Sequence, residues 1–184
     1  MAKFSSLGEC IAENGSALYG KCPRVGREAY LHTLYPPLAH DEIARLEQLV
    51  GRRLPQQLID FYAECNGFHY FLDTLIVYGL RKRSGRSGGA LLQPYDMRTP
   101  NVEERIRDAD EDMVFFAWYD WDGSLAYTRC GDSSIYLCGS DSIRPLKQWD
   151  SLDDFLSSES ERILGLFDSN GRLLDENAST LPAC

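Results

Sequence analysis

The 184-residue sequence contains few of the features that would place it in a membrane, outside the cell or in a common enzyme class. No apolar run approaches the roughly 18 to 20 residues of a membrane span. The N-terminus carries Lys3 but no apolar segment behind it, so we expect no secretory signal and a cytoplasmic protein. The six cysteines form no C-x-x-C pair, which favours reduced thiols over disulfides or a zinc site.

Motifs that hold metals or phosphates are also missing. The three histidines do not form H-E-x-x-H, and glycine-rich residues 81–89 lack the Lys-Ser or Lys-Thr that completes a P-loop. Asp108, Asp110 and Asp112 imitate the start of a calcium loop, but the position that requires glycine holds Met113. We therefore predict no metal, no cofactor and no catalytic residue.

Only Cys65 and His69 bring a thiol and an imidazole close together in the sequence. Asn66-Gly67 lies between them and interrupts the helix, so the two side chains do not share a helical face. A deep pocket converging on either residue would nevertheless indicate a small enzyme with an unrecognised site.

Basic charge is scarce, with 19 Lys and Arg against 28 Asp and Glu and a net charge of −9. This excess argues against partners that are themselves polyanions, so we expect no binding to nucleic acid or to an anionic membrane. Residues 1–92 carry a net charge of +2, whereas residues 93–184 carry −11. An acidic half of this kind would steer a basic protein toward it.

Apolar spacing predicts a pair of helices in the first half. Ile43, Leu46 and Val50 form one face of a helix that starts near His40 and ends at Gly51. A second helix follows Leu54-Pro55 and closes at Asn66-Gly67. The looser spacing of residues 4–14, which ends at Asn14-Gly15, predicts a further helix in an N-terminal helical extension over residues 1–29.

The second half has the pattern of an antiparallel meander. Short apolar runs separated by turns predict strands at residues 75–78, 113–118, 125–128 and 134–138, with a short edge at residues 143–146. A last helix begins near Ser151, where Asp154 completes a capping box. We predict an α+β fold with a single, largely antiparallel sheet of about 4–6 strands, packed with the N-terminal helix pair and the C-terminal helix. The domain spans residues 30–175, and residues 176–184 form a flexible tail.

Four motifs in this order resemble the SUKH superfamily, which includes fungal cell-wall assembly regulators and many bacterial immunity proteins. They are Ile-x-x-Leu-Glu, Gly-x-x-Leu-Pro, a closing Asn-Gly, and Trp-x-Ser-Leu-x-x-Phe-Leu, which stand at residues 43–47, 51–55, 66–67 and 149–156. The resemblance covers residues 30–165. His40 replaces the Ser or Thr usual at the first helix cap, and the insertion over residues 81–112 is longer than the family shows.

The resemblance implies a non-catalytic protein that binds another protein. It suggests an immunity protein, a monomer or weak homodimer, that neutralises a cognate toxin of nuclease or deaminase type. An alternative is a regulatory scaffold or adaptor like the cell-wall assembly regulators. Because many nuclease toxins are basic, charge also favours a basic toxin.

Charge density and an aromatic in a turn point to one candidate contact surface. Trp121 sits between two aspartates, and it either projects as a binding anchor or folds back onto the sheet. The candidate partner-binding residues are Asp110, Glu111, Asp112, Asp120, Trp121 and Asp122.

Overall fold

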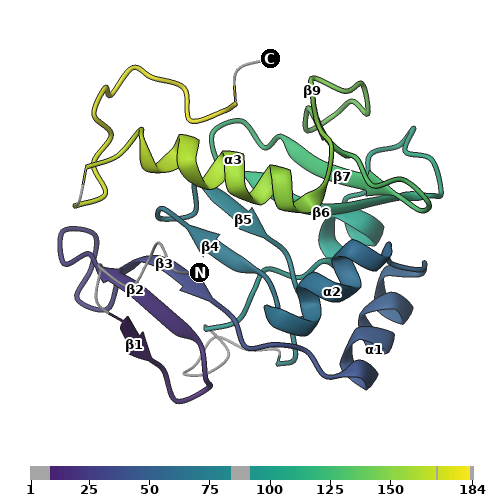
Figure 1. Ribbon diagram of the computed structural model, residues 1–184, viewed down its shortest axis with the longest axis horizontal. Coiled ribbons are helices and arrows are strands. Elements are labelled where there is room, and N and C mark those ends of the chain that lie inside the picture. Colours follow the sequence, from purple (N-terminus) through teal and green to yellow (C-terminus); the bar gives the residue numbers. More distant parts are fainter. Residues whose placement is uncertain (1–8, 84–91, 169, 183–184) are drawn as a thin grey trace.

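One antiparallel sheet runs through the whole described part of the chain, and helices pack on it. The computed structural model describes residues 9–83, 92–168 and 170–182. Within these ranges the sheet has nine strands, in the order β1 to β9, each paired with its neighbours in sequence (Figure 1). The predicted α+β class and single antiparallel sheet are confirmed, but the sheet has more strands than the 4–6 expected.

The helices α1 and α2 separate the first three strands from the rest, and α3 follows the last strand. A short π-helical turn, η3, precedes β6. The element bounds are β1 Glu9–Ile11, β2 Ala17–Lys21, β3 Tyr30–Leu34, α1 His40–Val50, α2 Gln56–Glu64, β4 Phe68–Tyr70, β5 Leu75–Val77, η3 Thr99–Glu103, β6 Met113–Tyr119, β7 Leu125–Arg129, β8 Ile135–Cys138, β9 Lys147–Trp149 and α3 Leu152–Leu164.

The described residues of the N-terminal extension, 9–29, form β-strands and turns rather than a helix. Residues 9–11, which the spacing of residues 4–14 assigned to a helix, form edge strand β1 and pair with residues 17–19. Asn14-Gly15 is the turn of this hairpin, with Gly15 at φ +85° and the Asn14 Oδ1 accepting a hydrogen bond from the Ser16 N–H at 3.1 Å. The prediction of helix was wrong because Asn-Gly marks a hairpin turn as readily as a helix end.

The predicted helix pair is confirmed, and its corner explains two of the motifs. Gly51 ends α1 at φ +77°, and the Glu47 carbonyl accepts hydrogen bonds from both Gly51 and Arg52 N–H. The Glu47 carboxylate then accepts the Leu54 N–H at 2.9 Å, immediately before Pro55 leads into α2. The Leu-Glu and Gly-x-x-Leu-Pro motifs thus form one hydrogen-bonded turn.

Asn66-Gly67 connects α2 to the sheet rather than capping the helix, which ends at Glu64. The Asn66 side chain bonds to both backbone groups of Leu80, with its Oδ1 2.7 Å from the Leu80 nitrogen and its Nδ2 3.0 Å from the Leu80 carbonyl. Gly67 has φ +82°, and a Cβ there would lie 2.4 Å from the Val77 carbonyl oxygen. Only glycine fits this backbone crossing.

Strand β6 is buried on both faces, as its continuous apolar run predicts. A bulge between Phe115 and Ala117 shifts the side-chain alternation. As a result Phe116 packs edge-on against Phe155 of α3. On the other face, Phe115 lies beneath the Arg105 guanidinium at 5.5 Å.

Helix α3 is anchored at both ends. At its start the Ser151 hydroxyl accepts the Asp154 N–H at 3.1 Å, as the predicted cap requires, and Trp149 packs edge-on against Phe155. Near its end Arg162 donates to the carbonyls of Thr180 (2.8 Å) and Leu181 (3.2 Å). Within the predicted flexible tail, Thr180 and Leu181 are therefore held against α3.

Smaller predictions had mixed outcomes. The edge strand expected at residues 143–146 lies slightly later, as β9. Residues 81–89 were predicted as a loop, and 84–89 lie outside the described residues. Within the ranges that the structure covers, no helix has both the length and the apolarity of a membrane span.

Candidate protein-binding surfaces

The six predicted binding residues do not form one surface. Asp110, Glu111 and Asp112 precede β6, whereas Asp120, Trp121 and Asp122 follow it. At about 3.3 Å per residue, strand β6 holds the two groups roughly 25 Å apart. They lie at opposite ends of the sheet and must be considered separately.

Two of the three carboxylates of the first group face an arginine of the same chain. Arg129 on β7 lies 2.9 Å from Asp110 Oδ2 and 2.8 Å from Asp112 Oδ1. The Arg105 guanidinium also donates to the Asp110 carbonyl. This pairing offsets much of the negative charge that the sequence suggested. Among the described residues, no acidic, histidine or cysteine side chains gather as a metal site, here or elsewhere.

The second group projects from the turn between β6 and β7. The Asp122 carboxylate accepts the Ser124 N–H at 2.8 Å, and Gly123 adopts φ +79°, so the turn is closed internally. Trp121 is 51% exposed, so about half of the residue is accessible to a partner, which favours the projecting alternative. Asp120 beside it is also exposed.

Neighbouring turns bring more polar and aromatic groups to this end. The pairing of Leu75 with Tyr119 sets the β4–β5 turn beside the β6–β7 turn. In the β4–β5 turn, Asp73 Oδ1 lies 2.8 Å from His69 Nδ1. The His69 ring packs edge-on against the half-exposed Tyr95 ring, with centroids 4.9 Å apart.

The pKa of the Tyr95 hydroxyl reflects the negative charge at this end of the sheet. Burial raises the pKa of its hydroxyl, and the carboxylates of Asp73 and Asp120 raise it further, while Arg81 opposes them. Both carboxylates therefore act on one hydroxyl. We call Asp73, Tyr95, Asp120, Trp121 and Asp122 the sheet-end patch. The sequence pattern found three of its members but missed Asp73 and Tyr95, which only strand pairing brings there.

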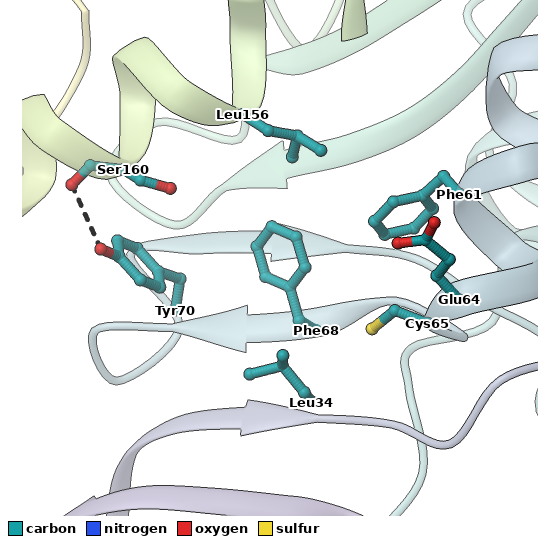
Figure 2. A pocket seen from close by; sticks show the side chains of 8 residues that line it. All are labelled: Leu34, Phe61, Glu64, Cys65, Phe68, Tyr70, Leu156 and Ser160. Atoms are coloured by element: carbon teal, nitrogen blue, oxygen red, sulfur yellow. Dashed lines mark hydrogen bonds between the residues drawn. The ribbon is translucent and has the colours of Figure 1, made fainter. Parts of the chain in front are cut away.

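A second feature, which sequence reasoning missed entirely, is a groove between α2 and α3 (Figure 2). It encloses about 190 Å³ and has a largely apolar lining. Side chains from both helices and from strands β3 and β4 point into it, with the Tyr70 hydroxyl bonded to the Ser160 carbonyl at 3.1 Å. The lining residues are Leu34, Phe61, Glu64, Cys65, Phe68, Tyr70, Leu156 and Ser160.

The groove does not assemble a thiol–imidazole pair. Cys65 lines it, but His69 is absent from its lining and instead packs against Tyr35 and Tyr95. Burial raises the pKa of the Cys65 thiol to about 12, and the Sγ donates to the Gly67 carbonyl at 3.1 Å. The thiol is thus held protonated, the opposite of what a nucleophile needs. The described cysteines are all free, including Cys10 and Cys22.

Comparison with known protein families supports the resemblance that the sequence motifs suggested. No curated protein matches the chain. Residues 37–158 match the SMI1 / KNR4 family (SUKH-1), which is generally non-catalytic. This range is about two thirds of the sequence and contains the α1–α2 corner, the Asn66-Gly67 crossing and the start of α3. The chain therefore belongs to the SMI1 / KNR4 family (SUKH-1).

Proposed function

We propose that this protein is an immunity protein that neutralises a basic protein toxin by binding it directly, with the sheet-end patch as the contact surface. SUKH domains are commonly immunity proteins. The free cysteines fit a cytoplasmic site of action, where thiols stay reduced. The observation that carries the choice of surface is the half-exposed Trp121 flanked by two aspartates.

The sheet-end patch suits a basic partner better than the Asp110 group does. Asp110 and Asp112 already face Arg129, so a partner's cation would compete with an existing ion pair. Asp120 has an exposed carboxylate beside an exposed indole. A partner arginine could pair with the carboxylate and stack on the ring, and Trp with Arg is a frequent combination at binding hot spots.

Co-expression with the toxin encoded by a neighbouring gene tests the proposal. The intact protein is expected to relieve toxicity, and Asp120→Lys is expected to weaken that relief because it reverses the charge facing the toxin. Glu13→Lys is the matched control, since Glu13 is an exposed acid in the β1–β2 hairpin, away from the patch. A neighbouring product that is not toxic, or toxicity that the intact protein does not relieve, would refute the immunity role. Equal protection by both variants would refute the surface alone.

A further inference from the structure

The groove between α2 and α3 has a floor suited to one apolar side chain. Leu34, Phe61, Phe68 and Leu156 line it, and all four remain partly exposed, although the last three also pack against the core. Apolar side chains that stay accessible in a concave site are the usual lining of a binding groove. The Tyr70–Ser160 hydrogen bond ties strand β4 to α3 and fixes one end of the groove (Figure 2).

The rim of the same groove is acidic. A second hollow of about 370 Å³ shares Phe61, Glu64 and Leu156 with the first, so the two are continuous. Its remaining lining adds the exposed carboxylates of Asp60 and Asp153. Neither lining contains a lysine, arginine or histidine. Any ligand therefore meets an apolar floor between carboxylates.

The two helices that flank the groove strengthen this field. Besides Glu159, which is buried, α2 and α3 carry five carboxylates and a single cation, Arg162. That guanidinium is already bound to Glu159 and to carbonyls of the C-terminal segment. It is not directed to the groove, so the negative potential over the rim has no local counter-charge on either helix.

We propose that this groove binds a short segment of a partner protein that inserts one leucine or aromatic side chain between flanking lysines or arginines. Charge selects this occupant: a second copy of the chain would bring its own acidic helices against the rim, and a fatty acid or nucleic acid would bring an anion. The site is separate from the sheet-end patch and does not depend on the partner being a toxin.

A peptide titration tests the proposal. The probe is a fluorescein-labelled peptide with two leucines between pairs of lysines. Two matched peptides carry glutamates in place of the lysines or serines in place of the leucines. We expect saturable binding of the first peptide alone, weakening as salt rises from 50 to 500 mM because the rim charges are exposed. Amide NMR shifts are expected to cluster at Phe61, Phe68 and Leu156.

Three variants of the protein complete the test. Glu64→Lys with Asp153→Lys is expected to weaken binding about tenfold, because it reverses two rim charges. Ser160→Phe is expected to abolish binding by filling the groove. Glu13→Lys, away from the groove, should leave binding unchanged. If Ser160→Phe does not fold, the rim variant still tests the proposal, since Glu64 and Asp153 are both exposed.

Other results would overturn the proposal. One is binding of the glutamate or serine peptide as tight as that of the first peptide, and another is NMR shifts confined to the sheet-end patch. A third is no binding at 1 mM peptide, a concentration on the order of the Kd of the weakest specific complexes. Sedimentation that shows a dimer dispersed by the rim variant would assign the groove to a second copy. Binding that appears only after deletion of residues 1–8 would assign it to the chain's own N-terminus. The effect of Asp120→Lys on toxin relief does not bear on any of these peptide-binding measurements. Each of the two proposals can therefore fail without the other.

Discussion

Removing the Glu159 carboxylate should destabilise the fold more than any surface change on α3. Glu159 is 1% exposed and accepts hydrogen bonds from the Arg162 guanidinium at 2.6 to 3.1 Å and from the Tyr119 hydroxyl at 2.8 Å. Burial and the Glu159 charge raise the pKa of Tyr119 well above its ordinary value, so its hydroxyl stays a donor. Glu159→Ala leaves the Tyr119 hydroxyl without this acceptor and the Arg162 guanidinium without its counter-charge.

The size of the effect follows from the geometry. Breaking a buried ion pair costs about 3 to 5 kcal/mol, and the Arg162 side chain is 22% exposed, so water offsets part of the loss. We expect about 3 kcal/mol by urea unfolding, and a fall in Tm of about 6 to 12 °C for a chain of this size. Arg162 also holds Thr180 and Leu181, so faster proteolysis of the C-terminal segment should accompany the loss.

A double-mutant cycle separates the pair from a simple cavity effect. Glu159→Ala with Arg162→Met removes the uncompensated cation and should recover about 1 to 2 kcal/mol relative to the sum of the single changes. Ser157→Ala, at an exposed position of the same helix, is the control and should stay within about 0.5 kcal/mol of the parent. A Glu159→Ala cost below about 1 kcal/mol would refute the reasoning.

Three further predictions test other parts of the fold. Burial lowers the pKa of His32 to about 4 from an ordinary 6.5, so the unfolded chain binds more protons between these values and stability falls on acidification. Between pH 7 and pH 5 the parent should lose about 2 kcal/mol of unfolding free energy through His32, and His32→Gln should not show this loss. Urea unfolding of both proteins at the two pH values measures the difference. Gly67→Ala should lower the free energy of unfolding by at least about 3 kcal/mol or prevent folding, because the added Cβ would clash with the Val77 carbonyl oxygen. Soluble yield and thermal unfolding measure this effect. In the native protein a thiol reagent should modify exposed Cys10 and Cys130 at pH 8 well before Cys138, whose pKa burial raises to about 12; peptide mapping that finds Cys138 labelled equally fast would contradict its burial.

Elements defined by local patterns could be predicted from the sequence. The apolar faces of α1 and α2 repeat every three to four residues, and the strands from β5 to β8 are apolar runs bounded by turns. Strand β1 and the pairing of β3 with β4 could not be predicted in this way. Cys10 and Ile11 of β1 are exposed, so β1 has no buried alternation, and β3 pairs with β4 across the whole helix pair.

The candidate binding surfaces likewise include features that local sequence patterns predict and features that depend on tertiary contacts. Asp110 and Asp120 are close in sequence, which suggested one acidic surface, but a seven-residue strand separates them. Arg129 neutralises the first group from another strand, and no local pattern reveals that pairing. The exposure of Trp121 followed correctly from its position in an Asp-Gly turn. The groove depends on α2 and α3 meeting over the sheet, which no single motif encodes.

The proposed binding surface is tested by the affinity of the purified protein for the product of the neighbouring toxin gene, measured with and without the Trp121 side chain. Calorimetry with the parent, Trp121→Ala and the matched control Leu174→Ala, an exposed apolar side chain elsewhere, gives the comparison. We expect at least about a thirtyfold weaker affinity for Trp121→Ala, equivalent to about 2 kcal/mol, and no change for the control. Equal affinities for all three proteins would contradict the proposed surface.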